Sequence, residues 1–164
     1  MTSLPIAHVY WIDNIDTDRI IPGKYTKTLD TSTLAAHVLE DLDPQFAKNV
    51  RPGDLLVAGH NFGCGSSREQ APIALQAAGI SAVIARSFAR IFYRNAINIG
   101  LPVLEAEHHN IHPGDSVTID LEQGLVTNHT RNETYRATQM PQQMMNILHA
   151  GGLVNYLLKH GDYL

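Results

Sequence analysis

The sequence contains a single cysteine, Cys64, among its 164 residues. One cysteine cannot form a disulfide within the chain, and an iron–sulfur cluster generally needs several thiolate ligands. Any such cluster would therefore have to be bound by another chain.

Positive charge and long apolar runs are also scarce. The 12 lysines and arginines are outnumbered by 16 acidic residues, which gives a formal net charge of −4. Nucleic acids and anionic membranes are bound by clustered positive charge, so neither is an expected partner. No apolar run approaches the roughly 20 residues that cross a bilayer, and the first residues lack the pattern of a secretory signal. We therefore expect a cytoplasmic protein.

Short apolar runs separated by turn-forming residues predict the secondary structure. Strands and helices alternate over most of the chain, which favours parallel strand pairing and an α/β fold. The expected strands cover residues 6–12, 55–58, 82–85, 117–121, 125–128 and 133–136. The expected helices cover 31–38, 68–78, 88–98 and a stretch from about 141, with a terminal helix and a loose tail in 151–164. The hydrophobic content of 44% is enough for one core, so a single domain over 1–164 is expected.

The most unusual segment is residues 61–69, NFGCGSSRE, between a predicted strand and a predicted helix. Gly63 and Gly65 allow backbone N–H groups to approach a ligand, and a helix N-terminus adds partial positive charge. Arg68 can bind a carboxylate through two parallel hydrogen bonds. These features predict a binding site for a small acid.

Other interpretations of this segment compete with a ligand site. Ser66 and Glu69 have the S-x-x-E spacing of a capping box, in which both side chains satisfy backbone N–H groups of the helix. A capping box does not need two glycines, nor an arginine in the first turn, where a cation is unfavourable by about 0.3–1 kcal/mol. The G-x-x-x-x-G-K-S/T order of a nucleotide loop is absent. Cys64 could be a nucleophile with a lowered pKa, but without an evident histidine partner we interpret it as a loop residue.

Four segments of the sequence carry a family resemblance. Residues 63–72, GCGSSREQAP, closely resemble the signature of the swivelling domain of aconitase-like enzymes, especially the small subunits of isopropylmalate isomerase and homoaconitase. Residues 13–22, 85–92 and 95–104, DNIDTDRIIP, ARSFARIF and NAINIGLPVL, match in the same order. The resemblance is clear from about residue 10 to residue 105 and general afterwards.

The resemblance implies a swivelling β/β/α domain, with a parallel or mixed sheet or a barrel core and flanking helices. It also implies a small subunit that is active only with a large subunit, which carries a [4Fe-4S] cluster. The implied activity is that of a hydro-lyase of leucine biosynthesis, which interconverts 2- and 3-hydroxy acids by dehydration and rehydration. The expected substrate is a small hydroxy di- or tricarboxylic acid, and this chain itself is expected to bind no metal or cofactor.

Residue roles follow from the same resemblance. Ser66 resembles the catalytic serine that takes the proton of the substrate as an alkoxide. Ser67 and Arg68 are similar to the ligands of a substrate carboxylate, and Gly65 belongs to the turn whose N–H groups would stabilise the oxyanion. The loop 25–28 resembles the loop that reads the variable group of the substrate, which adds Thr26, Lys27 and Thr28 to the expected site.

Lys27 leaves the substrate open. Homoaconitase-like chains tend to carry an arginine at this place, whereas leucine-pathway chains often carry a less charged residue. A lysine could pair with a distal carboxylate or phosphate, and a solvated loop lysine is an equal alternative. A homoaconitase, a dimethylmalate or citraconate-type hydratase and a phosphorylated-acid dehydratase therefore remain alternatives. A carboxylate-binding regulatory module is the non-enzyme alternative.

Two further polar groups are interpreted as structural. The aspartates in residues 13–18 lack the remaining positions of a calcium-binding loop, so we expect them to form turns. The histidines in residues 108–112 lack partners for a zinc site and are expected at the surface.

Overall fold

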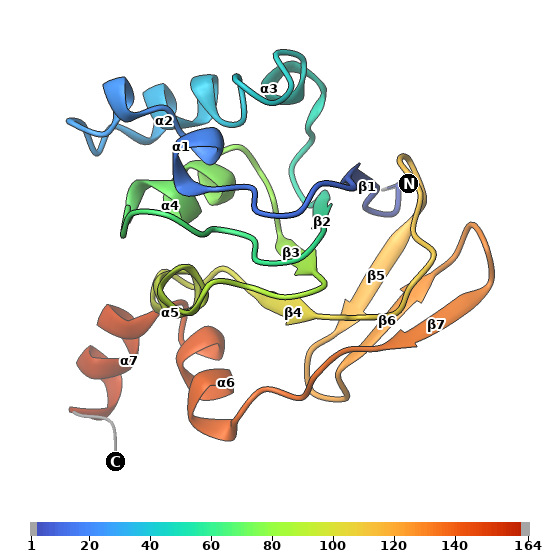
Figure 1. The fold of residues 1–164 in the computed structure, drawn as a ribbon. Coiled ribbons are helices and arrows are strands. Elements are labelled where there is room, and N and C mark those ends of the chain that lie inside the picture. The colour runs from blue at the N-terminus through green and yellow to red at the C-terminus, as the bar shows by residue number, and fades with distance from the viewer. Residues whose placement is uncertain (1–2, 162–164) are drawn as a thin grey trace.

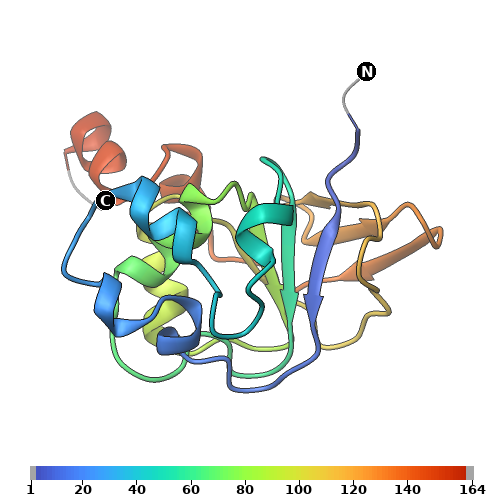
Figure 2. The ribbon, with the colours of Figure 1, turned by 90° about the horizontal axis from the view of Figure 1, so that it is seen from above.

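The computed structural model describes residues 3–161, which form three layers (Figures 1 and 2). The middle layer is a four-stranded parallel sheet in the described part of the chain, with the order β1-β2-β3-β4. Its strands are β1 (Ala7–Tyr10), β2 (Leu55–Ala58), β3 (Ala82–Ala85) and β4 (Val103–Glu105). Helices cover one face of this sheet, and a second sheet covers the other.

The strand order explains why the helices share one face. Each strand pairs with the next strand in the sequence, and crossovers between parallel strands are right-handed, so successive connections run over the same side. Before β2 come α1 (Thr17–Ile20), the 3-10 helix η1 (Gly23–Tyr25), α2 (Thr31–His37) and α3 (Phe46–Asn49). Later elements are α4 (Gln70–Ala77), α5 (Arg90–Asn98), α6 (Gln142–His149) and α7 (Leu153–His160). None of these described helices is long and apolar enough to cross a membrane.

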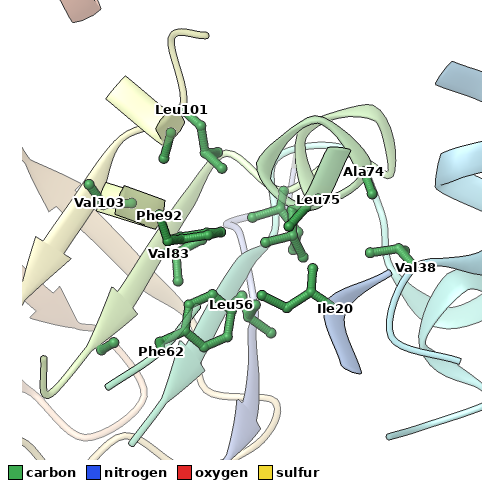
Figure 3. Close-up of a cluster of buried hydrophobic side chains, with 14 of the residues drawn as sticks. Ile20, Val38, Leu56, Phe62, Ala74, Leu75, Val83, Phe92, Leu101 and Val103 are labelled. Carbon is green, nitrogen blue, oxygen red and sulfur yellow. The ribbon is translucent and has the colours of Figure 1, made fainter. Parts of the chain in front are cut away.

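The parallel sheet is buried on both faces, because successive side chains of a strand point to opposite sides. Toward the helices, Leu56 and Val83 pack with Leu75 of α4 and with Phe92 of α5 (Figure 3). The alternate residues of the strands, including Ile84, pack toward the second sheet. All four residues of β2 and of β3 are buried, which explains their continuous apolar sequence.

The second sheet is antiparallel, in the order β5-β6-β7. Its strands are β5 (Val117–Asp120), β6 (Leu125–Asn128) and β7 (Glu133–Arg136). Backbone hydrogen bonds tie it to both edges of the parallel sheet: Ala7 N–H donates to the Asp115 carbonyl at 2.9 Å, and Thr138 N–H to the Glu105 carbonyl at 2.8 Å. The expected β/β/α class is therefore confirmed, with two separate sheets in place of a barrel.

Two predicted helix starts are wrong. The helix α4 begins at Gln70, and Glu69 at its N-cap makes no side-chain capping bond, so the S-x-x-E capping box does not form. The helix α5 begins at Arg90 and not beside Ser87, whose hydroxyl accepts the Asn61 N–H at 2.7 Å. In both places the serine hydroxyl meets a residue from elsewhere in the fold, Thr17 of α1 for Ser66 and Asn61 for Ser87, in place of the local capping pattern. The expected terminal helix is α7, and the end of the predicted tail, 162–164, lies outside the described residues.

Candidate active site

The candidate site lies where the loops after β1 and β2 leave the carboxyl edge of the sheet. Backbone hydrogen bonds of 2.8 Å run from Asn14 N–H to the His60 carbonyl and from Gly63 N–H to the Ile15 carbonyl. These bonds continue the parallel pairing of β1 and β2 beyond the ends of the strands. Residues 61–69 are thereby placed against the segment 13–22, which supplied another part of the family resemblance.

Gly63 and Gly65 of the loop meet different structural requirements. Gly63 has φ +83°, and a Cβ on it would lie 2.3 Å from Cγ of Phe92. Gly65 has φ +95°, but a Cβ there would lie 3.4 Å from Asp16 Cβ, close to ordinary contact. Gly63 therefore serves close packing against α5, whereas Gly65 serves the left-handed turn before the serines.

Ser66 and Ser67 follow this turn and are both exposed. The Ser66 carbonyl accepts the Arg68 N–H at 2.9 Å and the Thr17 hydroxyl at 3.0 Å. The Ser66 hydroxyl oxygen lies 3.4 Å from the Thr17 hydroxyl oxygen. The Ser66 carbonyl is therefore held by two donors, and its hydroxyl lies against Thr17 although the residue is exposed.

Arg68 is oriented by groups from the segment after α1. Its Nη1 donates to Asp18 Oδ1 at 2.7 Å and to the Ile21 carbonyl at 3.2 Å. The same Asp18 oxygen accepts the Gly23 N–H at 3.1 Å. These hydrogen bonds, first that from Arg68, lower the pKa of Asp18. A guanidinium has five N–H donors, so an Arg68 held at Nη1 can still bind an anion through Nη2 and Nε.

The loop expected to read the substrate lies beside the start of α4. The Gln70 side-chain amide donates to the Thr26 carbonyl at 2.9 Å, which ties this loop to the helix that follows Arg68. The hydroxyls of Thr26 and Thr28 bond within the loop, to the Gly23 carbonyl and from the Asp30 N–H respectively. Lys27 is exposed. The two threonine hydroxyls therefore stabilise the conformation of the loop, and the charged side chain of the loop that is exposed belongs to Lys27.

A second polar cluster joins the loops that follow β1, β2 and β4. His60 Nε2 lies 2.9 Å from Glu107 Oε1, and His60 Nδ1 lies 3.4 Å from Asp13 Oδ1. The hydrogen bond to Glu107, with a contribution from Asp13, raises the pKa of His60. Nearby, Trp11 stacks on His109 at 5.1 Å, and burial lowers the pKa of that histidine to about 4. His109 is therefore a partly buried stacking residue and not the surface histidine expected.

Comparison with known proteins identifies the family. Residues 6–109 match the model of the aconitase C-terminal domain. The chain belongs to this family.

Two curated relatives have the same sequence identity to this chain. A 3-isopropylmalate dehydratase small subunit of Caldicellulosiruptor saccharolyticus is 57% identical over 153 residues, 92% of this chain and 88% of that protein. A methanogen homoaconitase small subunit of Methanothermobacter thermautotrophicus is 57% identical over 150 residues, with the same coverage of 92% and 88%. The crystal structure of 3-isopropylmalate dehydratase from Methanocaldococcus jannaschii superposes with a TM-score of 0.91 at 50% identity, covering 96% of this chain and 93% of that one. The predicted membership among aconitase-type small subunits is confirmed.

The residues of this family member do not fit an iron–sulfur cluster. Cys64 is its single cysteine, and burial, followed by the charge of Asp16, raises the pKa of the thiol. The lowered pKa considered for a Cys64 nucleophile is therefore wrong. Among residues 3–161 no group of three or more histidine, cysteine or acidic side chains could hold a metal ion.

Three residues of the site were not identified from the sequence. Thr17 and Asp18 lie in the resembling segment 13–22, where the local sequence pattern indicates only turn-forming acidic residues. Gln70 comes two residues after Arg68 of the Ser-Ser-Arg motif, and its sequence context indicates only a position in the helix. Their contacts with Ser66, Arg68 and the loop 25–28 span 44 to 50 residues of sequence. The only local signal was their place inside segments that resemble the family.

Proposed function

We propose that this chain is the small subunit of an aconitase-type hydro-lyase and that Ser66 is its catalytic base. The observation that carries the proposal is the exposed Ser66 at a glycine turn, two residues before an Arg68 oriented by Asp18. Membership in the aconitase C-terminal domain family, together with relatives that are named as hydro-lyase small subunits, supports this reaction class.

The proposed base needs a stabilising environment. A serine hydroxyl is far too weakly acidic to lose its proton in water near neutral pH, so its oxyanion must be stabilised by N–H donors and positive charge. Gly65 and the segment before α4 offer backbone N–H groups, and Arg68 offers the charge. In the forward reaction Ser66 would take a carbon-bound proton next to a carboxylate, while the hydroxyl of the neighbouring carbon leaves. The product is an unsaturated acid, to which water is added again in the opposite orientation.

Arg68, Ser67 and Gly65 would bind a carboxylate of the substrate. Nη1 of Arg68 is already engaged with Asp18, which fixes the plane of the guanidinium before any ligand arrives. Such preorganisation reduces the ordering that binding would otherwise require. The Ser67 hydroxyl and the Gly65 N–H would complete the set of donors to the carboxylate.

A large subunit completes the proposed enzyme. Ser66 and Ser67 are exposed at the edge of the sheet, so a substrate bound there needs a second wall that excludes water. The [4Fe-4S] cluster would belong to that subunit, because this chain has one cysteine. The cytoplasmic location expected from the sequence remains a prediction.

The proposed substrate is a hydroxy acid of the isopropylmalate type, in agreement with the several relatives named 3-isopropylmalate dehydratase small subunit. One observation favours a second candidate, a homoaconitase-type acid with a distal carboxylate. Lys27 is exposed on the loop that Gln70 holds beside α4, where a cation could meet such a group.

Replacement of neighbouring serines in the reconstituted two-subunit enzyme tests the proposal. Ser66→Ala should lower kcat by about 10²–10⁴-fold, the range of a lost general base. Ser67→Ala is the matched control, equally exposed and one residue away, and should mainly raise KM. Melting temperatures and co-elution with the large subunit verify that both variants fold and assemble. Unchanged kcat in an assembled Ser66→Ala enzyme would rule out the serine base.

A further inference from the structure

Thr17 is a buried threonine whose hydroxyl lies beside Ser66, the proposed base. It is the first residue of α1 and only 3% exposed. Its N–H donates to the Cys64 carbonyl at 2.8 Å, which anchors its backbone to the site loop. Its Oγ1 lies 3.0 Å from the Ser66 carbonyl oxygen and 3.4 Å from Ser66 Oγ. The Thr17 hydroxyl therefore contacts both the backbone carbonyl and the side-chain hydroxyl of Ser66.

The hydroxyl of Thr17 can serve either neighbour. It has one proton to donate and two lone pairs that accept, so with its proton on the Ser66 carbonyl it can accept a hydrogen bond from the Ser66 hydroxyl. Rotation about the Cβ–Oγ1 bond would move the donated hydrogen bond to Ser66 Oγ without a shift of heavy atoms. The β-branched side chain is stiff at χ1, and its burial keeps water from taking its place.

We propose that Thr17 is a positioning residue that holds the Ser66 side chain toward substrate and donates its O–H to the Ser66 oxygen once that oxygen is deprotonated. The inference rests on the proposed function, in which Ser66 is the base. Hydrogen bonds to an ionised acceptor are roughly twice as strong as neutral ones, so the bond favours the oxyanion over the neutral hydroxyl. No proton leaves Thr17 in this step, because only its donor direction changes.

A purely structural Thr17 would have different consequences. The Ser66 carbonyl also accepts the Arg68 N–H, so it keeps a donor when the threonine hydroxyl is removed. Loss of the hydroxyl should therefore leave the loop folded. A residue that only connects α1 to the loop would change stability or subunit assembly, but not the pH at which the base becomes active.

The test compares Thr17→Val and Thr17→Ser in the reconstituted two-subunit enzyme, with kcat and KM measured across pH. Thr17→Val keeps the shape and removes the donor, and should lower kcat by about 10-fold or more while KM changes by less than about 3-fold. The rising limb of its kcat profile should move to higher pH by about one unit, because a less stabilised oxyanion forms at higher pH. Thr17→Ser keeps the donor and should retain kcat within about 3-fold, with an unshifted limb.

Several outcomes would overturn the inference. A folded Thr17→Val enzyme with wild-type kcat, or with a lower kcat and an unshifted pH limb, would contradict the donor role. Should Thr17→Val fail to assemble, Thr17→Ser decides, because loss of turnover in that folded variant would contradict it as well. The Ser66→Ala enzyme separates the two proposals. Full activity of Ser66→Ala would contradict the serine base and with it the role of Thr17. An inactive Ser66→Ala together with a fully active Thr17→Val would contradict only the role of Thr17.

Discussion

The Arg68 guanidinium donates to the Asp18 carboxylate, which is itself held by a backbone N–H. Asp18 accepts both the Arg68 guanidinium and the Gly23 N–H, and its side chain is 63% exposed while that of Arg68 is 25% exposed. Because the folded pKa of Asp18 is lowered, the stability from this pair is present above the unfolded pKa and is lost only as pH falls through the folded value. Arg68 therefore stays oriented at neutral pH, where a carboxylate ligand would be ionised.

Lys27 is the residue through which the substrate class can be tested. If a distal carboxylate pairs with it, Lys27→Ala should raise KM for acids with that group by about 10-fold, the usual scale of a lost charged hydrogen bond. Isopropylmalate-type acids should be affected little. Lys24→Ala is the control, since Lys24 is exposed in η1 directly before the loop 25–28 and lies over the Tyr25 ring at 5.2 Å. If Lys27→Ala leaves the substrate preference unchanged, Lys27 is a solvated loop residue, and the variable group of the substrate is apolar.

The glycine turn between β2 and α4 joins packing to chemistry. The buried ring of Phe92 in α5 occupies the space that a side chain at residue 63 would need. Gly65 turns the chain toward the serines. The loop therefore cannot shift without disturbing the contact between α5 and the sheet. This contact gives the exposed serines a rigid support, as a preorganised site requires.

Substitution of these glycines should separate backbone strain from steric overlap. Gly63→Ala combines φ +83° with a Cβ 2.3 Å from Phe92 Cγ, and should lower the free energy of unfolding by about 3 kcal/mol or more. Gly114→Ala is the matched control, with φ +85° and nothing within 4 Å, and should cost only about 1–2 kcal/mol. Denaturant titrations measure both losses, and equal losses would contradict the packing role of Gly63.

His60 links the loops after β1, β2 and β4 in a way that depends on pH. Its pKa is raised by Glu107 and Asp13, so its stabilising contribution is fully present below the unfolded value near 6.5 and is lost as pH rises through the folded value. The free energy of unfolding of wild type should therefore exceed that of His60→Ala most clearly near pH 6 and least near pH 9. In NMR titrations, Glu107→Gln should lower the pKa of His60 toward its ordinary value. An unshifted pKa in that variant would mean that Glu107 is not the main cause.

The whole molecule places its candidate site at one edge of the middle layer. The helices cover one face of the parallel sheet and the antiparallel sheet covers the other, so the carboxyl edge remains as the place where loops meet (Figures 1 and 2). Ser66 and Ser67 are exposed, so within residues 3–161 the site loop is open to solvent at these two serines. This arrangement suits a subunit that completes its site by association. The expectation of a single domain over 1–164 stays a prediction.

Partner dependence is the prediction at this scale. The purified chain should be colourless and without turnover on hydroxy acids, because its one cysteine cannot supply the ligands of a cluster. Addition of a cluster-loaded large subunit should restore turnover, and the Ser66→Ala chain should co-elute with that subunit without restoring it. Turnover by the chain alone, or iron–sulfur absorbance bound to it, would contradict the proposed division between the subunits.

Local features of the sequence predicted six of the described strands and the longer helices, and they indicated the chemical type of the proposed site. The strand β4 and the short helices α1, η1 and α3 were not predicted. Apolar runs, glycines that need a left-handed turn and the Ser-Ser-Arg motif act within a few residues, so they can be identified without a fold. The segment 63–72 also identified the family, which the match over residues 6–109 confirmed.

Only the tertiary structure decided how the site is supported. Thr17 lies against Ser66, and Asp18 against Arg68, because parallel pairing at the sheet edge sets the register between two loops far apart in sequence. The same long-range bonds overruled the local capping pattern of Ser66 and Glu69. Such contacts depend on nonlocal backbone hydrogen bonds, which no single stretch of residues specifies.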